Sequence, residues 1–188
     1  GCQFVAAAKG ANERGDTMTR RQFAVIAARI REELSNISLL QQELHAKGIL
    51  KTGLGQKKIN LKITNQNDTF ILRGIGSVLH DFYVSVENIF KLIAREIDDK
   101  VPTGDNWHKE LLNQMLLNIP EIRPALVSRP TGLKLEEFWA FRHVFRNVYG
   151  FNLAGDRLFA LLRKFPETAE QFEQEILQFL ADMEQVLP

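Results

Sequence analysis

Residues 138–153 read FWAFRHVFRNVYGFNL, and apolar side chains recur in this stretch at helical spacing. Spacings of three and four residues predict a helix with one buried side. The side chains predicted to be buried are Phe138, Phe141, Val144, Phe145 and Val148. We expect the helix to run from about Leu133 to Tyr149 and to end at Gly150, because glycine is common directly after the last helical residue.

The same stretch carries polar side chains along one side of the predicted helix. With about 100° of rotation per residue, Arg146 lies about 40° and Tyr149 about 20° from Arg142, so the three side chains form one line. His143 and Asn147 form the adjacent line. A helix whose only role is to pack into the core would carry ordinary solvated polar residues along this side. We therefore expect the functional site on this helix.

Arg142, position 147 and Tyr149 have the spacing of the Arg-x4-His-x-Tyr motif of the HepT-like toxins. These toxins are a branch of the HEPN superfamily of helical ribonucleases. Two further stretches resemble the family, LHDFYVSVENIF at 79–90 and PTGDNWHKELLNQM at 102–115, and the resemblance covers about residues 68–165. The chain departs from the motif at position 147, where Asn stands in place of His.

The resemblance implies a metal-independent endoribonuclease that is the toxin of a toxin–antitoxin pair, with two motifs facing each other across a homodimer cleft. It implies that Arg142 binds the reacting phosphate, and Arg146 could bind a second phosphate of the RNA. Asn147 cannot exchange a proton at neutral pH, so His143 is the candidate acid or base in its place. The family also implies AMPylation of Tyr149 by a nucleotidyltransferase antitoxin, which would add negative charge beside the arginines.

Two alternatives stay open. Loss of a general acid or base typically costs about 10² to 10⁴ in rate, so the chain could be a weak nuclease or a non-catalytic HEPN module that binds RNA or a partner protein. Such a module would use the same groove for binding. Apart from both alternatives, the polar side chains at 142, 143, 146 and 149 could form interhelical contacts only.

Helical periodicity along the chain predicts an all-α fold. With the resemblance, it implies a HEPN-like antiparallel bundle of five to six helices. Helices are expected at 19–46, 69–97, from 103 or 105 to 116, 133–149, 156–165 and 167–187. Asn67, Asp68 or Thr69 is expected to cap the second of these helices, and Thr103 or Asp105 the third. Residues 48–67 are expected to be a loop that could include a short extended piece, and Pro120, Pro124 and Pro130 predict an irregular connector at 119–132.

Residues 18–188 are expected to form one HepT-like domain, and 1–17 to be either an added leader or a native flexible arm. A single cysteine, Cys2, fits a reducing compartment. No apolar run reaches the roughly 20 residues that span a bilayer, so we expect a cytoplasmic protein without a membrane partner. The four histidines are scattered, and no His-x3-His or paired-cysteine spacing occurs, so no metal or other cofactor is expected.

Charge is unevenly distributed along the chain. Residues 121–165 contain eight Lys or Arg and four Asp or Glu, whereas 166–188 contain six acids and no base. This pattern could attract RNA to one face, although solvated helix surfaces would give the same counts. The roles of His80, Asp81, Trp107 and His108 stay open between lining a groove and holding neighbouring helices together.

Overall fold

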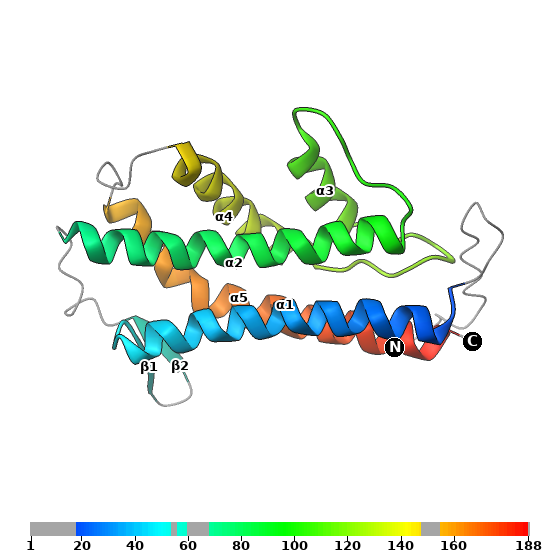
Figure 1. Ribbon diagram of the computed structural model, residues 1–188, viewed down its shortest axis with the longest axis horizontal. Helices are drawn as coiled ribbons and strands as arrows, with labels where there is room; N and C mark the ends of the chain where they lie inside the picture. Colours follow the sequence, from blue (N-terminus) through cyan, green and yellow to red (C-terminus); the bar gives the residue numbers. More distant parts are fainter. Residues whose placement is uncertain (1–17, 54–55, 60–67, 148–154, 188) are drawn as a thin grey trace. The chain divides into compact units, whose positions relative to one another are not determined.

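The computed structural model describes residues 18–53, 56–59, 68–147 and 155–187, with only the backbone described at 52–53, 56–59 and 146–147. This part of the chain contains five helices and a two-stranded antiparallel hairpin (Figure 1). The elements are α1 (Arg20–Ala46), β1 (Leu50–Gly53), β2 (Gln56–Ile59), α2 (Thr69–Glu96), α3 (Trp107–Met115), α4 (Arg129–Asn147) and α5 (Gly155–Val186). The all-α fold with five to six helices predicted from the sequence is confirmed.

The elements contribute to two compact units. One unit comprises the chain up to Glu33, Glu87–Gly132 and the chain from Phe172, and the other comprises Leu34–Val86 and Leu133–Gln171. The long helices α1, α2 and α5 each contribute to both units, while α3 belongs to the first. Most of α4, including the stretch that begins at Phe138, belongs to the second.

In the first unit, the core is formed by apolar stripes of α1, α2, α3 and α5. Phe90 of α2 meets Phe172 of α5 edge to face, with ring centroids 6.0 Å apart. Other fully buried side chains in this core are Phe23, Ile30, Ile89, Ile93, Leu111, Met115 and Ile176. Their spacing of three, four and seven residues is the helical pattern visible in the sequence, so burial follows directly from the periodicity.

In the second unit, Phe82 of α2 lies against two other phenylalanine rings. Its ring centroid is 5.0 Å from that of Phe138 on α4 and 5.1 Å from that of Phe165 on α5, both in edge-to-face geometry. All three rings are buried, and each such pair contributes about 0.5–1.5 kcal/mol beyond the burial of apolar area. This aromatic cluster fixes the position of α4 on α2.

The sequence prediction of two separate helices around Pro166 is wrong, because α5 is continuous from Gly155 to Val186 and contains Pro166. Proline removes one backbone hydrogen bond, but the buried stripe of Leu162, Phe165 and Ala169 continues across it. The hydroxyl of Thr168 also donates to the carbonyl of Lys164 at 2.8 Å. Burial on both sides of the proline therefore outweighs the lost bond.

The predicted start of the central helix at Leu133 is also wrong, since α4 begins at Arg129. Pro130 lies in the first turn, where the missing N–H has no helical partner to lose. The N–H of Ser128 donates to Glu175 of α5 at 2.8 Å, and the hydroxyl of Thr131 donates to the same carboxylate at 2.8 Å. The hydroxyl of Ser128 in turn accepts from the N–H of Thr131 at 3.4 Å, so Ser128 caps the helix and Glu175 holds the cap in place. Part of the predicted irregular connector is therefore helical.

The sequence predictions for the hairpin segment and for the starts of α2 and α3 were correct in some points and wrong in others. Residues 48–67 were predicted to be a loop that could include a short extended piece, and they include the hairpin, in which Leu50 pairs with Ile59. The predicted cap of α2 is confirmed, because Asp68 Oδ1 accepts from the N–H of Phe70 at 2.9 Å. A cap of α3 by Thr103 or Asp105 is wrong: the residue before the helix is Asn106, and its side chain forms no capping bond.

Candidate functional site on α4

Arg142, the first residue of the motif, lies on the side of α4 that is buried earlier in the helix. Thr131, Leu135 and Phe138 are buried, and Arg142 follows Phe138 by four residues, on the same side of the helix, where it is half-buried. The sequence predicted burial of Val144, but this side chain is 53% exposed. That prediction placed the buried side too far round the helix, since it grouped all the apolar residues and treated the arginine line as outward-facing.

Two aromatic contacts with α2 lie on either side of Arg142. Phe138 contacts Phe82, and Phe145 contacts His80 with ring centroids 5.5 Å apart. Because the later residue of α4 meets the earlier residue of α2, the two helices are antiparallel at this contact. Arg142 lies between the two contact points, at the edge of the packed surface, and its Nε is buried.

The close approach of the helices depends on Gly76 of α2. A Cβ at this position would lie 2.5 Å from Cε2 of Phe145, which no side chain larger than hydrogen allows without movement of the ring. Phe145 in turn stacks with Phe141 at 5.5 Å. The glycine therefore allows the aromatic side of α4 to pack beside the motif.

The structure describes the predicted site residues to different extents. Arg142 and His143 are adjacent on α4, with Arg142 half-buried and His143 exposed. Arg146 and Asn147 belong to the last turn of α4, but their side chains are outside the described residues, and Tyr149 is outside them altogether. The predicted line of Arg142, Arg146 and Tyr149 therefore stays a prediction.

A second polar group joins α2 and α3, around Glu87. This carboxylate is buried, and it binds the Lys91 ammonium at 2.7 Å and Nδ1 of His108 at 2.8 Å. Trp107 stacks on His108, and Lys91 lies 4.5 Å from the centre of the indole ring. From the sequence, Trp107 and His108 had no predicted partner. The only signal for the partner was an acid in an otherwise apolar stretch of α2, four residues before a lysine.

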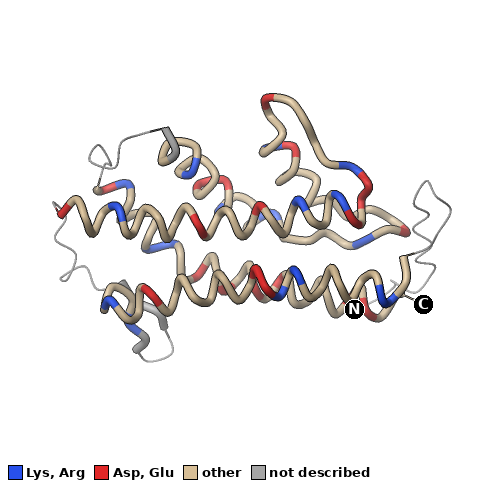
Figure 2. Tube along the Cα trace, in the orientation of Figure 1, with Lys and Arg blue, Asp and Glu red and all other residues tan. Residues whose placement is uncertain are grey.

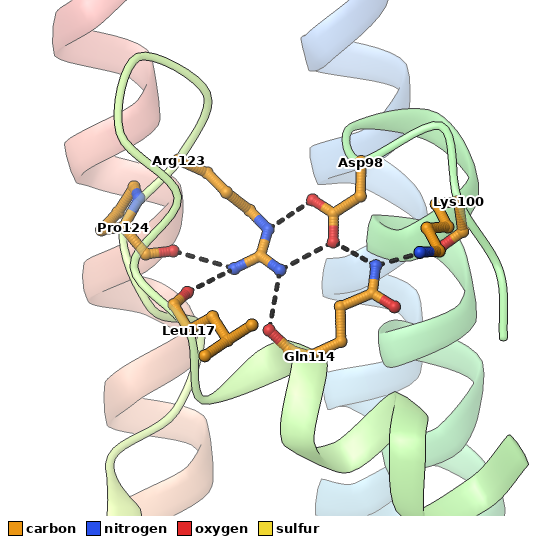
Figure 3. Close-up of polar contacts among 6 residues, drawn as sticks. All are labelled: Asp98, Lys100, Gln114, Leu117, Arg123 and Pro124. Carbon is orange, nitrogen blue, oxygen red and sulfur yellow. Dashed lines mark hydrogen bonds and ion pairs between the residues drawn. The ribbon is translucent and has the colours of Figure 1, made fainter.

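Arg123 forms a third polar group, which the sequence analysis missed. Its side chain is fully buried and pairs with Asp98 through Nε at 2.5 Å and Nη2 at 2.7 Å (Figure 3). Three backbone carbonyls complete the set: Leu117 and Pro124 accept from Nη1, and Gln114 accepts from Nη2. All five N–H donors of the guanidinium therefore have acceptors, as expected for a structural arginine.

Ion pairs offset much of the uneven charge counted along the sequence. Lys134 of α4 binds Glu167 of α5 at 2.5 Å, and Lys164 of α5 binds Glu137 of α4 at 2.6 Å. The hydrogen bond from Lys134 and its charge lower the pKa of Glu167 below its ordinary value. With α4 carrying both signs of charge (Figure 2) and Arg123 enclosed, the basic stretch presents less positive surface than its composition suggests.

The described part of the chain contains neither a membrane-spanning helix nor a cluster of metal ligands. None of its helices is long and apolar enough to cross a membrane. Within the same residues, no three His, Cys, Asp or Glu side chains gather closely enough to hold a metal ion.

Comparison with known proteins gives one match. The sequence model of a family described as HepT-like protein matches residues 74–183. The matched range contains α3, α4 and most of α2 and α5, and therefore the whole α2–α4 contact around Arg142. Neither the curated proteins nor the solved structures include one that matches the chain.

Proposed function

The chain belongs to the HepT-like protein family, and on this premise we propose that it is a ribonuclease toxin that cleaves RNA without a metal ion. The observation that carries the proposal is the half-buried position of Arg142 at the edge of the α2–α4 contact, inside the matched range. A plain surface arginine would be fully solvated. Partial enclosure strengthens the attraction of a guanidinium for a phosphate, because the local dielectric constant is lower than in water.

Arg142 would stabilise the negative charge that develops on the phosphate during cleavage. A planar guanidinium can donate to two phosphate oxygens and stays charged at every physiological pH. Arg146, one turn further along α4, would bind a neighbouring phosphate. Removal of one such electrostatic group typically lowers the rate by about 10² to 10³.

Proton transfer should be the slow part of the proposed reaction, because Asn147 occupies the motif position of the histidine. His143 is exposed on α4 next to Arg142, and we assign it the role of proton carrier. A slow nuclease is the expected result. The same substitution favours the alternative function, a non-catalytic HEPN module that binds RNA or a partner protein through this surface.

A homodimer is part of the proposal, because one copy of α4 offers few groups for both ends of a phosphodiester transfer. Two copies related by twofold symmetry, the commonest arrangement of oligomers, would bring two sets of these groups to one cleft. Sedimentation velocity at micromolar concentration tests this point. A species of only 21.5 kDa would contradict the composite cleft.

Regulation by a nucleotidyltransferase antitoxin completes the proposal. Attachment of AMP to Tyr149 would place a phosphodiester near the arginines and compete with the RNA backbone. Co-expression with the partner enzyme should add the mass of AMP to the peptide that contains Tyr149, and Tyr149→Phe should abolish the addition. An unmodified peptide in the presence of the active partner would limit neutralisation to complex formation.

The experiment that tests the nuclease is cleavage of an RNA oligonucleotide in the presence of EDTA by wild type, Arg142→Ala and Arg163→Ala. Arg163 is an exposed arginine on α5 and serves as the matched control for loss of one positive charge. We expect Arg142→Ala to lose cleavage by about 10² or more and Arg163→Ala to retain it. RNA binding without cleavage by the wild type would support the non-catalytic module instead.

A further inference from the structure

The segment that joins α1 to α2 is rich in lysine. Residues 44–67 contain five lysines and no Asp or Glu. The lysines are Lys47, Lys51, Lys57, Lys58 and Lys62. Lys47 and Lys51 are exposed, and neither forms an ion pair within the described residues. This charge therefore differs from that of α4, where Lys134 is paired with an acid of α5.

Strand pairing in the hairpin of β1 and β2 (Figure 1) sets two of these lysines opposite each other. Lys51 is the register partner of Lys58, and Thr52 is that of Lys57. Directly opposite residues of an antiparallel pair belong to one face, with Cα atoms about 4.5–5.5 Å apart, and like charges at such positions destabilise the pairing. Lys57, the neighbour of Lys58 in β2, belongs to the other face. The hairpin therefore has lysine positions on both faces, and a bound anion would relieve the repulsion.

The base of the hairpin is anchored to the end of α1. Gly48 follows the helix with a φ of 67°, in the left-handed region that favours glycine. The N–H of Ile49 donates to the carbonyl of Leu44 at 2.9 Å, as in a Schellman motif. Ile49 and Leu50 are buried, and Lys51 directly after them is exposed. The backbone that carries the lysines is therefore held in position before a ligand binds, which lowers the entropy lost on binding.

The hairpin lies outside the range that the chain shares with the family. The family model matches residues 74–183, whereas the two strands occupy 50–53 and 56–59. The hairpin belongs to the same compact unit as the motif on α4. It is an addition to the common part of the family, so its role is argued from its own residues.

The residues of the two strands favour RNA over a membrane or a protein as the partner. The strands read LKTG and QKKI, and lysine, threonine and glutamine are common ligands of nucleic-acid phosphates. Membrane-binding elements combine basic residues with exposed aromatic or aliphatic ones, whereas these strands contain no aromatic residue and Leu50 is buried. Lysine is also depleted in protein–protein interfaces. Of the three partners, the phosphate backbone of RNA fits best.

The same composition indicates which part of an RNA is bound. Unpaired bases are recognised by stacking on aromatic side chains, and the two strands have none. Paired stems are bound mainly through their phosphates and 2′-hydroxyls, with little dependence on sequence. Lysine, a compact charge on a flexible stem, suits such contacts. A paired stem is therefore the expected ligand.

We propose that Lys51, Lys57 and Lys58 bind the phosphates of a paired RNA stem, as a docking site separate from the motif on α4. The inference rests on the proposed function in one respect, that RNA is the ligand, and it holds whether or not the chain cleaves that RNA. Binding through lysine releases cations condensed on the RNA, so the affinity falls steeply with salt. An RNA that contains a stem is then the expected class of substrate.

The test measures binding of a fluorescent stem-loop RNA by the full chain over a range of salt concentrations. The RNA carries 2′-O-methyl groups, so it cannot be cleaved through its 2′-hydroxyls. A DNA stem-loop of the same sequence and vesicles that contain phosphatidylserine are the other ligands. The hairpin variant combines Lys51→Gln, Lys57→Gln and Lys58→Gln. The control variant removes three exposed positive charges elsewhere, by Lys100→Gln, Lys109→Gln and Arg163→Gln.

We expect the hairpin variant to bind the RNA more weakly by about tenfold or more, with the slope of log K against log salt smaller by about two to three. It should unfold at or slightly above the wild-type temperature, because the repulsion between opposite lysines is removed. Lys51→Gln alone should reduce the slope by about one. The control variant should keep the wild-type slope.

Wild-type affinity and slope in the hairpin variant would overturn the docking site and leave the nuclease untouched. Hairpin-dependent binding that is tighter for the DNA stem-loop or for the vesicles than for the RNA would overturn the choice of RNA. If the RNA stem-loop binds through the hairpin but unmodified RNA is not cleaved in EDTA, the nuclease falls and the docking site stands.

Discussion

Arg123 and Arg142 come from the same basic stretch of sequence, but the structure places them in opposite settings. Arg123 is fully buried, and acceptors from its own fold use all five of its N–H donors. Arg142 is half-buried at the edge of a helix contact, beside an exposed histidine. In the first setting, every N–H donor of the guanidinium is used inside the fold. In the second, the guanidinium is only partly enclosed, and we propose that Arg142 binds a phosphate of the RNA.

The largest expected effect is a loss of stability when Arg123 loses its ion-pair partner. Asp98→Ala should destabilise the protein by roughly 3–5 kcal/mol, because it leaves a buried guanidinium without its counter-charge. Urea unfolding followed by circular dichroism measures the loss. Asp105→Ala, a change of an exposed aspartate, is the control and should stay within about 0.5 kcal/mol of wild type.

The same network offers a sharper version of that test. The double variant Arg123→Met with Asp98→Leu removes both charges, so it should be more stable than Asp98→Ala alone, since no unpaired charge remains buried. A double variant as unstable as the single one would mean that the carbonyl bonds of Arg123, and not its ion pair, hold the connector between α3 and α4.

The second effect concerns the packing that supports Arg142. Gly76→Ala should cost about 1–3 kcal/mol, because its methyl group would collide with the Phe145 ring. Gly74→Ala, one half-turn earlier, meets no atom within 4 Å and should stabilise α2 by about 0.5–1 kcal/mol through helix propensity. Opposite signs in thermal unfolding are the expected result. Equal effects of the two changes would contradict the close contact of α2 with α4.

The smallest effect is on the ion pair between α4 and α5. The pKa of Glu167 is lowered by Lys134, so this pair stabilises the fold above the ordinary carboxyl pKa of 4.5 and its contribution is lost as the pH falls through the lowered value. Glu167 is largely exposed, so solvent screens the pair. The unfolding temperature of Lys134→Met should therefore be slightly lower than that of the wild type at neutral pH, and the two temperatures should become equal in acid.

Periodicity in the sequence predicted α1 and α2 and the stripes that they bury, because these depend on local spacing alone. It misplaced the start of α4 and predicted a break in α5 at Pro166 for a different reason. Tertiary contacts act at both points: Glu175 of α5 binds Ser128 and Thr131 at the start of α4, and burial carries α5 across Pro166. Local proline signals contain no information about either contact.

The candidate site was predictable only in part. The motif singled out Arg142, and His143 is its neighbour in sequence, so both could be named from local spacing. His80 meets Phe145 through the antiparallel packing of α2 on α4, and Glu87 meets His108 through the packing of α3 on α2. Single-sequence spacing cannot predict partners that come together across helices. The buried side of α4 was misjudged because some of its apolar residues, Leu133 and Val144 among them, are exposed.

The most direct test of the nuclease is the rate of RNA cleavage in EDTA by wild type and by Asn147→His, compared on the same oligonucleotide. The substitution supplies a proton carrier at the motif position, on the same helix as Arg142, the proposed phosphate ligand. We therefore predict slow cleavage by the wild type and cleavage faster by about 10² or more in Asn147→His, abolished in both backgrounds by Arg142→Ala. Two silent proteins that still bind the oligonucleotide would contradict the nuclease and leave an RNA-binding module.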